Sequence, residues 1–161
     1  MSPTCPGTIT PQEIPYANPR ANEAHGYYFD LMHTALGYVL VFLGGGLGAA
    51  ARHWVNRAML VLVGADYPAG TLIVNITGSM AMGMLAAWFA YRGETTTAAE
   101  RLFLTTGVLG GFTTFSAFAL DTRLMWERHD LIAAAIYAGA SVILSILGLI
   151  AGLFVVRVSL S

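Results

Sequence analysis

The segment Gly107–Phe118 contains residue types that could handle an ion inside a membrane. It reads GVLGGFTTFSAF and lies in a stretch without charged residues. Backbone groups in hydrocarbon must be hydrogen-bonded, so a helix break is tolerated only where it faces protein, water or an ion. We predict that Gly110, Gly111, Thr113 and Thr114 break a membrane helix halfway across the bilayer. The break would free carbonyl oxygens, which are typical cation ligands.

Two phenylalanines follow the threonines. Phe115 and Phe118 are three residues apart and share one helical face. The edge of an aromatic ring is partly positive, so two edges turned to a pore would offer an anion weak contacts. Ordinary core packing is the alternative explanation of this pair.

A second polar face precedes this segment. Thr71 and Asn75 are four residues apart in GTLIVNITG, and Asn75 is the one amide within the four long uncharged stretches of the chain. Its NH2 group has two donors, and burying them unpaired would cost a few kcal/mol. An interhelical hydrogen bond and a contact with an ion both remain open.

A third polar pattern occurs near the C-terminus. Tyr137, Ser141 and Ser145 follow one another at steps of four in an otherwise apolar stretch. Serines often bond back to their own helix, so isolated ones carry little information. Three aligned hydroxyls indicate a polar path along one helix face.

The elements that must position these residues are four membrane helices. The chain is 56% hydrophobic and 11% charged, with a mean hydropathy of +0.64, whereas soluble domains carry about 25% charged residues. Roughly 20 apolar residues span a bilayer. The uncharged stretches that meet this length are Leu31–Ala51, Tyr67–Tyr91, Leu102–Leu120 and Leu131–Val156. We predict an all-α, multi-pass membrane protein, in which the glycines Gly44–Gly46 and Gly48 let helices approach closely.

The first 30 residues differ from the rest and contain five of the six prolines. We expect residues 1–30 to form a flexible tail and residues 31–161 to form the four-helix domain.

Positive charge is balanced between the two sides of the membrane. Lysine is absent, and four spans would place Arg20, Arg92, Arg101 and Arg157 on one side and Arg52, Arg57, Arg123 and Arg128 on the other. Orientation follows an imbalance of Lys and Arg. We therefore expect insertion in both orientations and an antiparallel homodimer.

Three motifs in order carry a resemblance to a known family. They are GGLGAAAR at Gly45–Arg52, GTLIVNITG at Gly70–Gly78 and GGFTTFSAF at Gly110–Phe118. With these motifs, residues 36–157 resemble the bacterial fluoride channels (Fluc/CrcB family), which are dual-topology dimers of four-helix subunits.

The resemblance implies a function and its residues. Asn75, Phe115 and Phe118 match pore-lining positions, and Tyr137, Ser141 and Ser145 match a polar track. We expect Thr71, on the same face as Asn75, to line the fluoride pore as well. Gly110 and Thr113 match positions whose backbone carbonyls bind a central, structural sodium ion, two from each subunit. Leu149 stands where a hydroxyl would extend the track. Arg52 would draw anions into a vestibule by its field or anchor its helix at the headgroups.

The implied activity is passive fluoride export through two pores per dimer, in the bacterial inner membrane. The expected partners are fluoride, lipid and a second copy of the chain, and no nucleic acid.

The alternative is a small dual-topology multidrug or cation exporter, which needs a membrane carboxylate. Asp and Glu are absent from all four stretches. A structural or assembly subunit would account for the small residues but not for the polar face of the third stretch. We expect no enzyme, because the four histidines show no HExxH spacing.

Overall fold

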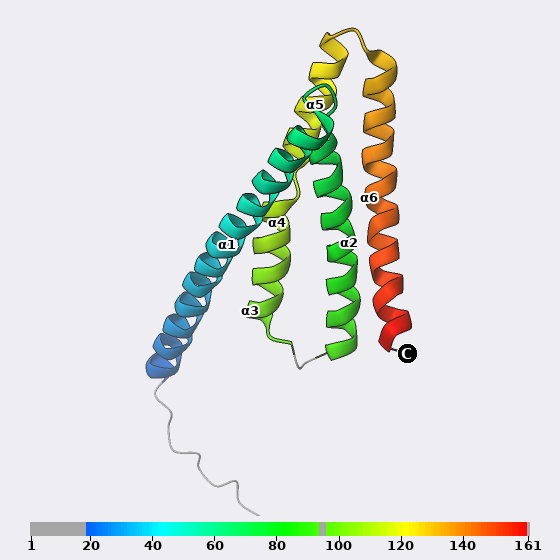
Figure 1. The fold of residues 1–161 in the computed structure, drawn as a ribbon. Helices are drawn as coiled ribbons and strands as arrows, with labels where there is room; N and C mark the ends of the chain where they lie inside the picture. Colours follow the sequence, from blue (N-terminus) through cyan, green and yellow to red (C-terminus); the bar gives the residue numbers. More distant parts are fainter. Residues whose placement is uncertain (1–18, 94–95, 161) are drawn as a thin grey trace, which may run out of the picture. The chain divides into compact units, whose positions relative to one another are not determined.

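The computed structural model describes residues 19–93 and 96–160, with side chains from residue 34 onward. Contacts divide the chain into two units, Met1–Ala35 and Leu36–Ser161. The elements of the described residues are α1 (Pro19–Val63), which enters the second unit at Leu36, α2 (Ala69–Arg92), α3 (Ala98–Arg101), the π-helix η2 (Leu102–Leu109), α4 (Gly110–Phe112), α5 (Phe115–Glu127) and α6 (Leu131–Leu160). The α-helices are labelled in Figure 1. Helix α1 begins within the expected tail, of which residues 1–18 lie outside the described part.

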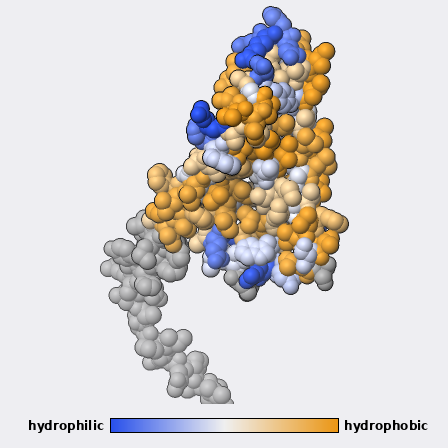
Figure 2. Space-filling view, viewed as in Figure 1, coloured by the Kyte–Doolittle hydropathy of each residue, from blue (hydrophilic) through white to orange (hydrophobic). Residues whose placement is uncertain are grey.

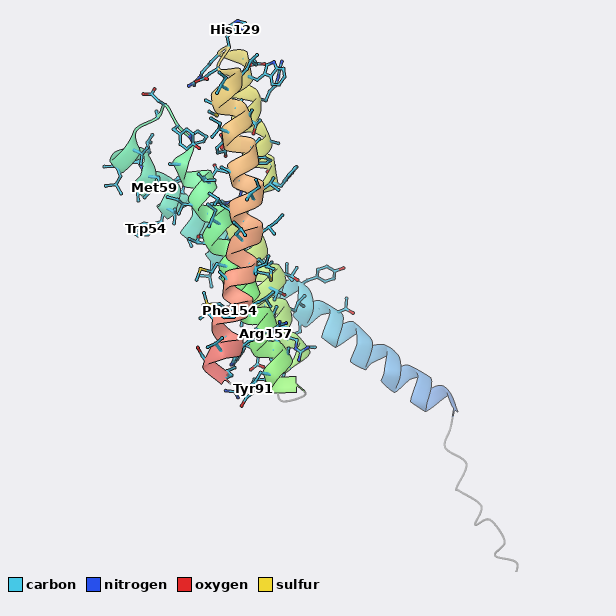
Figure 3. The ribbon with its side chains drawn as sticks, turned by 90° about the vertical axis from the view of Figure 1, so that its right-hand side faces the viewer. Trp54, Met59, Tyr91, His129, Phe154 and Arg157 are labelled. Atoms are coloured by element: carbon cyan, nitrogen blue, oxygen red, sulfur yellow. The ribbon has the colours of Figure 1, made fainter. Side chains whose placement is uncertain are left out.

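Four helical segments are long and apolar enough to cross a membrane, as predicted. They are Thr34–Val63, Ala69–Arg92, Ala98–Glu127 and Leu131–Leu160. On the face drawn in Figure 2, apolar side chains cover the middle of the helices, and hydrophilic side chains gather at the α5–α6 turn. Figure 3 places His129 at that end and Tyr91 and Arg157 at the opposite end of the α2–α6 pair. The described residues thus form a multi-pass membrane protein made of helices alone.

The helices extend beyond the uncharged stretches. The third segment was expected over Leu102–Leu120 but covers Ala98–Glu127. It begins earlier because Thr97 and Glu100 form a capping box, in which each side chain accepts a hydrogen bond from the other residue's backbone N–H. Charged residues at its far end do not stop it, so Asp121 lies inside α5.

Glycines set the contact between α1 and the third segment. A Cβ at Gly44 would lie 2.8 Å from the carbonyl oxygen of Phe103, and one at Gly48 would collide with the carbonyl oxygen of Val108. A Cβ at Gly111 would likewise lie 2.8 Å from Gly45 Cα. Backbone therefore packs directly on backbone at Gly44, Gly45 and Gly48, which is the packing role predicted for this glycine cluster, whereas a Cβ at Gly46 would have nothing within 4 Å.

Helices α2 and α6 lie side by side (Figure 1). Gly148 packs on the carbonyl oxygen of Ile76, Gly152 packs on that of Met80, and Gly83 packs on that of Leu149. These contacts fix which residues of the two helices stand at the same height. Other residues of the same two helices, such as Asn75 and Ser141, line the groove described below.

Candidate functional site

The third segment loses its helical conformation at two threonines. Helix α4 ends at Phe112 and α5 begins at Phe115, with Thr113 (φ −77°, ψ 156°) and Thr114 (φ −153°, ψ 116°) extended between them. Gly110 and Gly111 are helical, so the expectation that this glycine pair breaks the helix is corrected. Gly111 instead serves the close contact with Gly45.

Asn75 of α2 binds both backbone groups of Thr114. Asn75 Nδ2 donates to the carbonyl oxygen of Thr114 at 3.1 Å, and the N–H of Thr114 donates to Asn75 Oδ1 at 2.9 Å. Thr114 is buried, so without Asn75 its backbone N–H and carbonyl groups would have neither water nor this side chain as a partner. The sequence left two roles open for Asn75, and the interhelical hydrogen bond is present. One Nδ2 hydrogen remains beyond this pair.

The interruption removes the usual partners of two carbonyl oxygens. In an α-helix the carbonyl of residue i accepts from the N–H of residue i+4. For Gly110 that donor is the N–H of Thr114, which is bound to Asn75. For Thr113 it is the N–H of Ala117, which donates to Thr114 Oγ1 at 3.2 Å. The two carbonyls to which the family resemblance assigns a sodium ion are thus among those whose regular helical donors are engaged elsewhere.

A groove of about 380 Å³ lies beside this interruption, between α2, α5 and α6. No charged residue is among its lining residues, which are Asn75, Gly78, Ser79, Met82, Thr113, Thr114, Phe115, Phe118, Ser141, Val142, Ser145, Ile146 and Leu149. It thus brings together six of the residues singled out from the sequence: Asn75, Thr113, Phe115, Phe118, Ser141 and Ser145.

The two serines of α6 give the groove unused polar atoms. Ser141 Oγ and Ser145 Oγ are buried and have no hydrogen-bond partner among the described residues. Ser141 as a whole is only 4% exposed. A buried hydroxyl without a partner is costly unless water or a ligand reaches it. The groove wall thus contains two hydroxyl groups without a hydrogen-bond partner within 3.5 Å among the described residues.

The aromatic residues form a chain of ring contacts. The centroids of Phe115 and Phe118 are 5.3 Å apart, and those of Phe118 and Tyr137 are 5.7 Å apart. Phe115 is 78% exposed in the single chain, whereas Tyr137 is fully buried. Phe115 is therefore available for contacts outside its own chain, and Phe118 is held between it and the core.

Four of the predicted site residues do not line the groove: Gly110, Tyr137, Thr71 and Arg52. Tyr137 donates a hydrogen bond to Asp121 Oδ2 at 3.3 Å. Thr71 is buried and lines a separate cavity of about 310 Å³, shared with Asp121, Asn56 and Arg128. Arg52 is half-buried on α1 and lines neither space.

Sequence reasoning missed the particular roles of Thr114, Ser79 and Asp121. Thr114 could have been identified, because its hydroxyl caps the N-terminus of α5, and threonine is a preferred capping residue. Ser79 stands four residues after Asn75, the same spacing that joined Thr71 to Asn75. Among the described residues there is no cluster of three or more His, Cys, Asp or Glu side chains.

The comparisons with known proteins agree with the motifs. The family model described as "CrcB-like protein, Camphor Resistance (CrcB)" matches residues 39–153. The chain is 52% identical to "Fluoride-specific ion channel FluC 2" of Nitrobacter hamburgensis over 76% of this chain and 98% of that protein. It is 54% identical to "Fluoride-specific ion channel FluC" of Methylobacterium nodulans, over 76% and 97%. For the protein of the same name from Paracoccus denitrificans, the identity is 52%, over 79% and 97%. By these matches, the chain belongs to the CrcB-like family.

Proposed function

We propose that this protein is a passive fluoride channel, and that the groove beside Thr113–Thr114 is part of its pore. The observation that carries the proposal is the uncharged groove with unpaired serine hydroxyls, in a chain whose relatives are named fluoride-specific ion channels. A channel needs no coupling device. An inside-negative membrane potential would drive fluoride out of the cell with a free energy of about 2.3 kcal/mol per 100 mV.

The lining suits a small, strongly hydrated anion. Water around fluoride must be replaced by several donors, and conduction requires binding that is weak enough for release. Asn75 retains one Nδ2 hydrogen, Ser141 and Ser145 offer hydroxyl hydrogens, and the ring edges of Phe115 and Phe118 add weak positive contacts. A lysine or arginine in the groove would hold the anion too tightly, and none lines it.

The helix interruption is proposed to lie near the middle of the membrane and to hold a structural sodium ion. Hard cations prefer oxygen ligands. The carbonyl oxygens of Gly110 and Thr113 suit such an ion, because the N–H groups that would bind them in a regular helix are engaged elsewhere. Two carbonyls are too few for a full ligand shell. A second copy of the chain would contribute the other two.

The second copy is proposed to insert in the opposite orientation. The arginines are balanced between the two sides, so a single orientation is not favoured. Phe115 is largely exposed in one chain and would be covered by the partner. An antiparallel dimer would then contain two pores. The proposed location is the bacterial inner membrane, with Arg52 near one pore entrance.

One observation favours the alternative function, a small proton-coupled exporter. Asp121 lies inside α5 and accepts a hydrogen bond from buried Tyr137, so the third segment does contain a carboxylate. Proton exchange at Asp121 would be required by an exporter but not by a channel. Fluoride efflux through the wild type and through Asp121→Asn, each measured with and without a proton gradient, separates the exporter from the channel. A channel responds to neither the gradient nor the loss of proton exchange.

Reconstitution into liposomes tests the proposed function directly. Vesicles loaded with fluoride and diluted into fluoride-free buffer are followed with a fluoride electrode after valinomycin and potassium set the voltage. We expect rapid release without any proton gradient, and much slower release of chloride from matched vesicles. Fluoride that stays trapped until detergent is added would refute the channel.

A further inference from the structure

The hydroxyl track along α6 stops before the groove does. Tyr137, Ser141 and Ser145 follow at steps of four, and the next position in this series is Leu149, which still lines the groove. The side chains around this end of the groove on α6 are Ile146 and Leu149. On α6 alone, a hydrated anion would meet only apolar side chains here.

The opposite wall provides a hydroxyl at this place. Asn75 and Ser79 of α2 stand four residues apart, share one helix face and both line the groove. Ser79 is half-buried, which is consistent with a side chain that borders an open space.

The packing of α2 on α6 sets the height of Ser79. A Cβ on Gly148 would lie 3.0 Å from the carbonyl oxygen of Ile76 and 3.7 Å from Met80 Cβ. One turn further, Gly83 packs on the carbonyl oxygen of Leu149. Ser79 stands between Ile76 and Gly83 on α2. It is therefore at the height of Leu149, where α6 has no hydroxyl.

We propose that Ser79 supplies the hydroxyl that α6 lacks at Leu149, so that the polar wall of the pore passes from Ser145 on α6 to Ser79 on α2. This proposal rests on the proposed function, because it makes Ser79 a further residue that lines the fluoride pore. A donor at this height offsets part of the dehydration cost that the apolar side chains of Met82, Ile146 and Leu149 would impose.

The test compares fluoride efflux from liposomes for the wild type, Ser79→Ala and Ser79→Ala/Leu149→Ser. Loss of one hydrogen bond to an anion is expected to slow efflux about tenfold in Ser79→Ala. The double variant, which moves the hydroxyl to the facing helix, should recover to within about threefold of the wild type. Ser159→Ala is the matched control, because Ser159 is exposed and its hydroxyl bonds back to the carbonyl oxygen of Val155.

The outcomes separate this proposal from the function itself. If the wild type releases fluoride and Ser79→Ala releases it at the same rate, the role of Ser79 is overturned and the proposed channel function stands. Slow efflux in Ser79→Ala without recovery in the double variant also overturns it, since the hydroxyl at this height would then not be the cause. A wild type that releases no fluoride refutes the proposed function instead. Gel-filtration profiles identical to the wild type show that the variants are folded.

Discussion

Asn75 holds the one extended stretch of the third segment by binding the backbone N–H and the carbonyl oxygen of Thr114 at 2.9 and 3.1 Å. The two residues are 39 positions apart in the chain. Their contact joins α2 to the start of α5 and draws the N–H of Thr114 away from Gly110. A single side chain thus stabilises the interruption and engages the regular donor of a carbonyl proposed to bind a cation.

The first prediction concerns this clamp. Asn75→Asp keeps the size and the acceptor for the N–H of Thr114 but removes the donor to its carbonyl oxygen. It also places a carboxylate beside an anion path. We expect a loss of about 1–3 kcal/mol in stability, measured as a lower melting temperature in detergent, together with strongly reduced fluoride efflux.

Thr77→Val is the matched control for the clamp. The hydroxyl of Thr77 bonds back to the carbonyl oxygen of Ile73 within α2, so it joins no second helix. Its removal should leave melting temperature and efflux nearly unchanged. Wild-type behaviour of Asn75→Asp at neutral pH would contradict both roles of Asn75.

The second prediction separates the two rings of the groove. Phe115→Ile should reduce fluoride efflux sharply with little change in the stability of the single chain, because Phe115 is 78% exposed. Phe118→Ile should reduce efflux and also cost about 0.5–1.5 kcal/mol of stability, because its ring contacts Phe115 and Tyr137. Efflux and melting temperature are measured on the same preparations.

Phe154→Ile is the control for the rings, since Phe154 is exposed on α6 and does not line the groove. It lies near the Arg157 end of that helix in Figure 3. If both groove variants conducted like the wild type, the rings would have no part in permeation.

The third prediction compares two glycines of α1 that are two residues apart. A Cβ at Gly48 would meet the backbone of Val108 and Phe112, whereas one at Gly46 would have nothing within 4 Å. Gly48→Ala should destabilise the protein by about 1–3 kcal/mol through forced separation of the two backbones. Gly46→Ala should be neutral or slightly stabilising, because alanine favours the helix. Equal melting temperatures of the two variants would contradict the close packing of α1 on the third segment.

The four spans could be predicted from the sequence, because the length and hydrophobicity of the uncharged stretches carry that information. Helix ends could not be predicted from charge alone. Asp121 follows an uncharged stretch yet lies inside α5, where its carboxylate accepts a hydrogen bond from Tyr137. The capping residues Thr97 and Thr114 carry better information on where helical segments begin.

The position of the interruption depended on tertiary packing. Glycine destabilises an isolated helix, which is why Gly110 and Gly111 were expected to break it. In the folded chain Gly111 permits contact with Gly45, and the extended residues are Thr113 and Thr114. The hydrogen-bond partner of Asn75 could not be predicted from the sequence either, because the contact exists only once α2 and α5 have packed together.

The last prediction concerns the proposed sodium ion. The carbonyls of Gly110 and Thr113 would bind sodium in the folded dimer only, so sodium should raise stability by mass action, by about 2.7 kcal/mol at a concentration 100 times the dissociation constant. The wild type should therefore melt several degrees lower when sodium is replaced by N-methylglucamine at equal ionic strength. A sodium titration at constant chloride should give a saturating rise in melting temperature. Identical melting temperatures of the wild type in the two cations would contradict a structural sodium ion at this site.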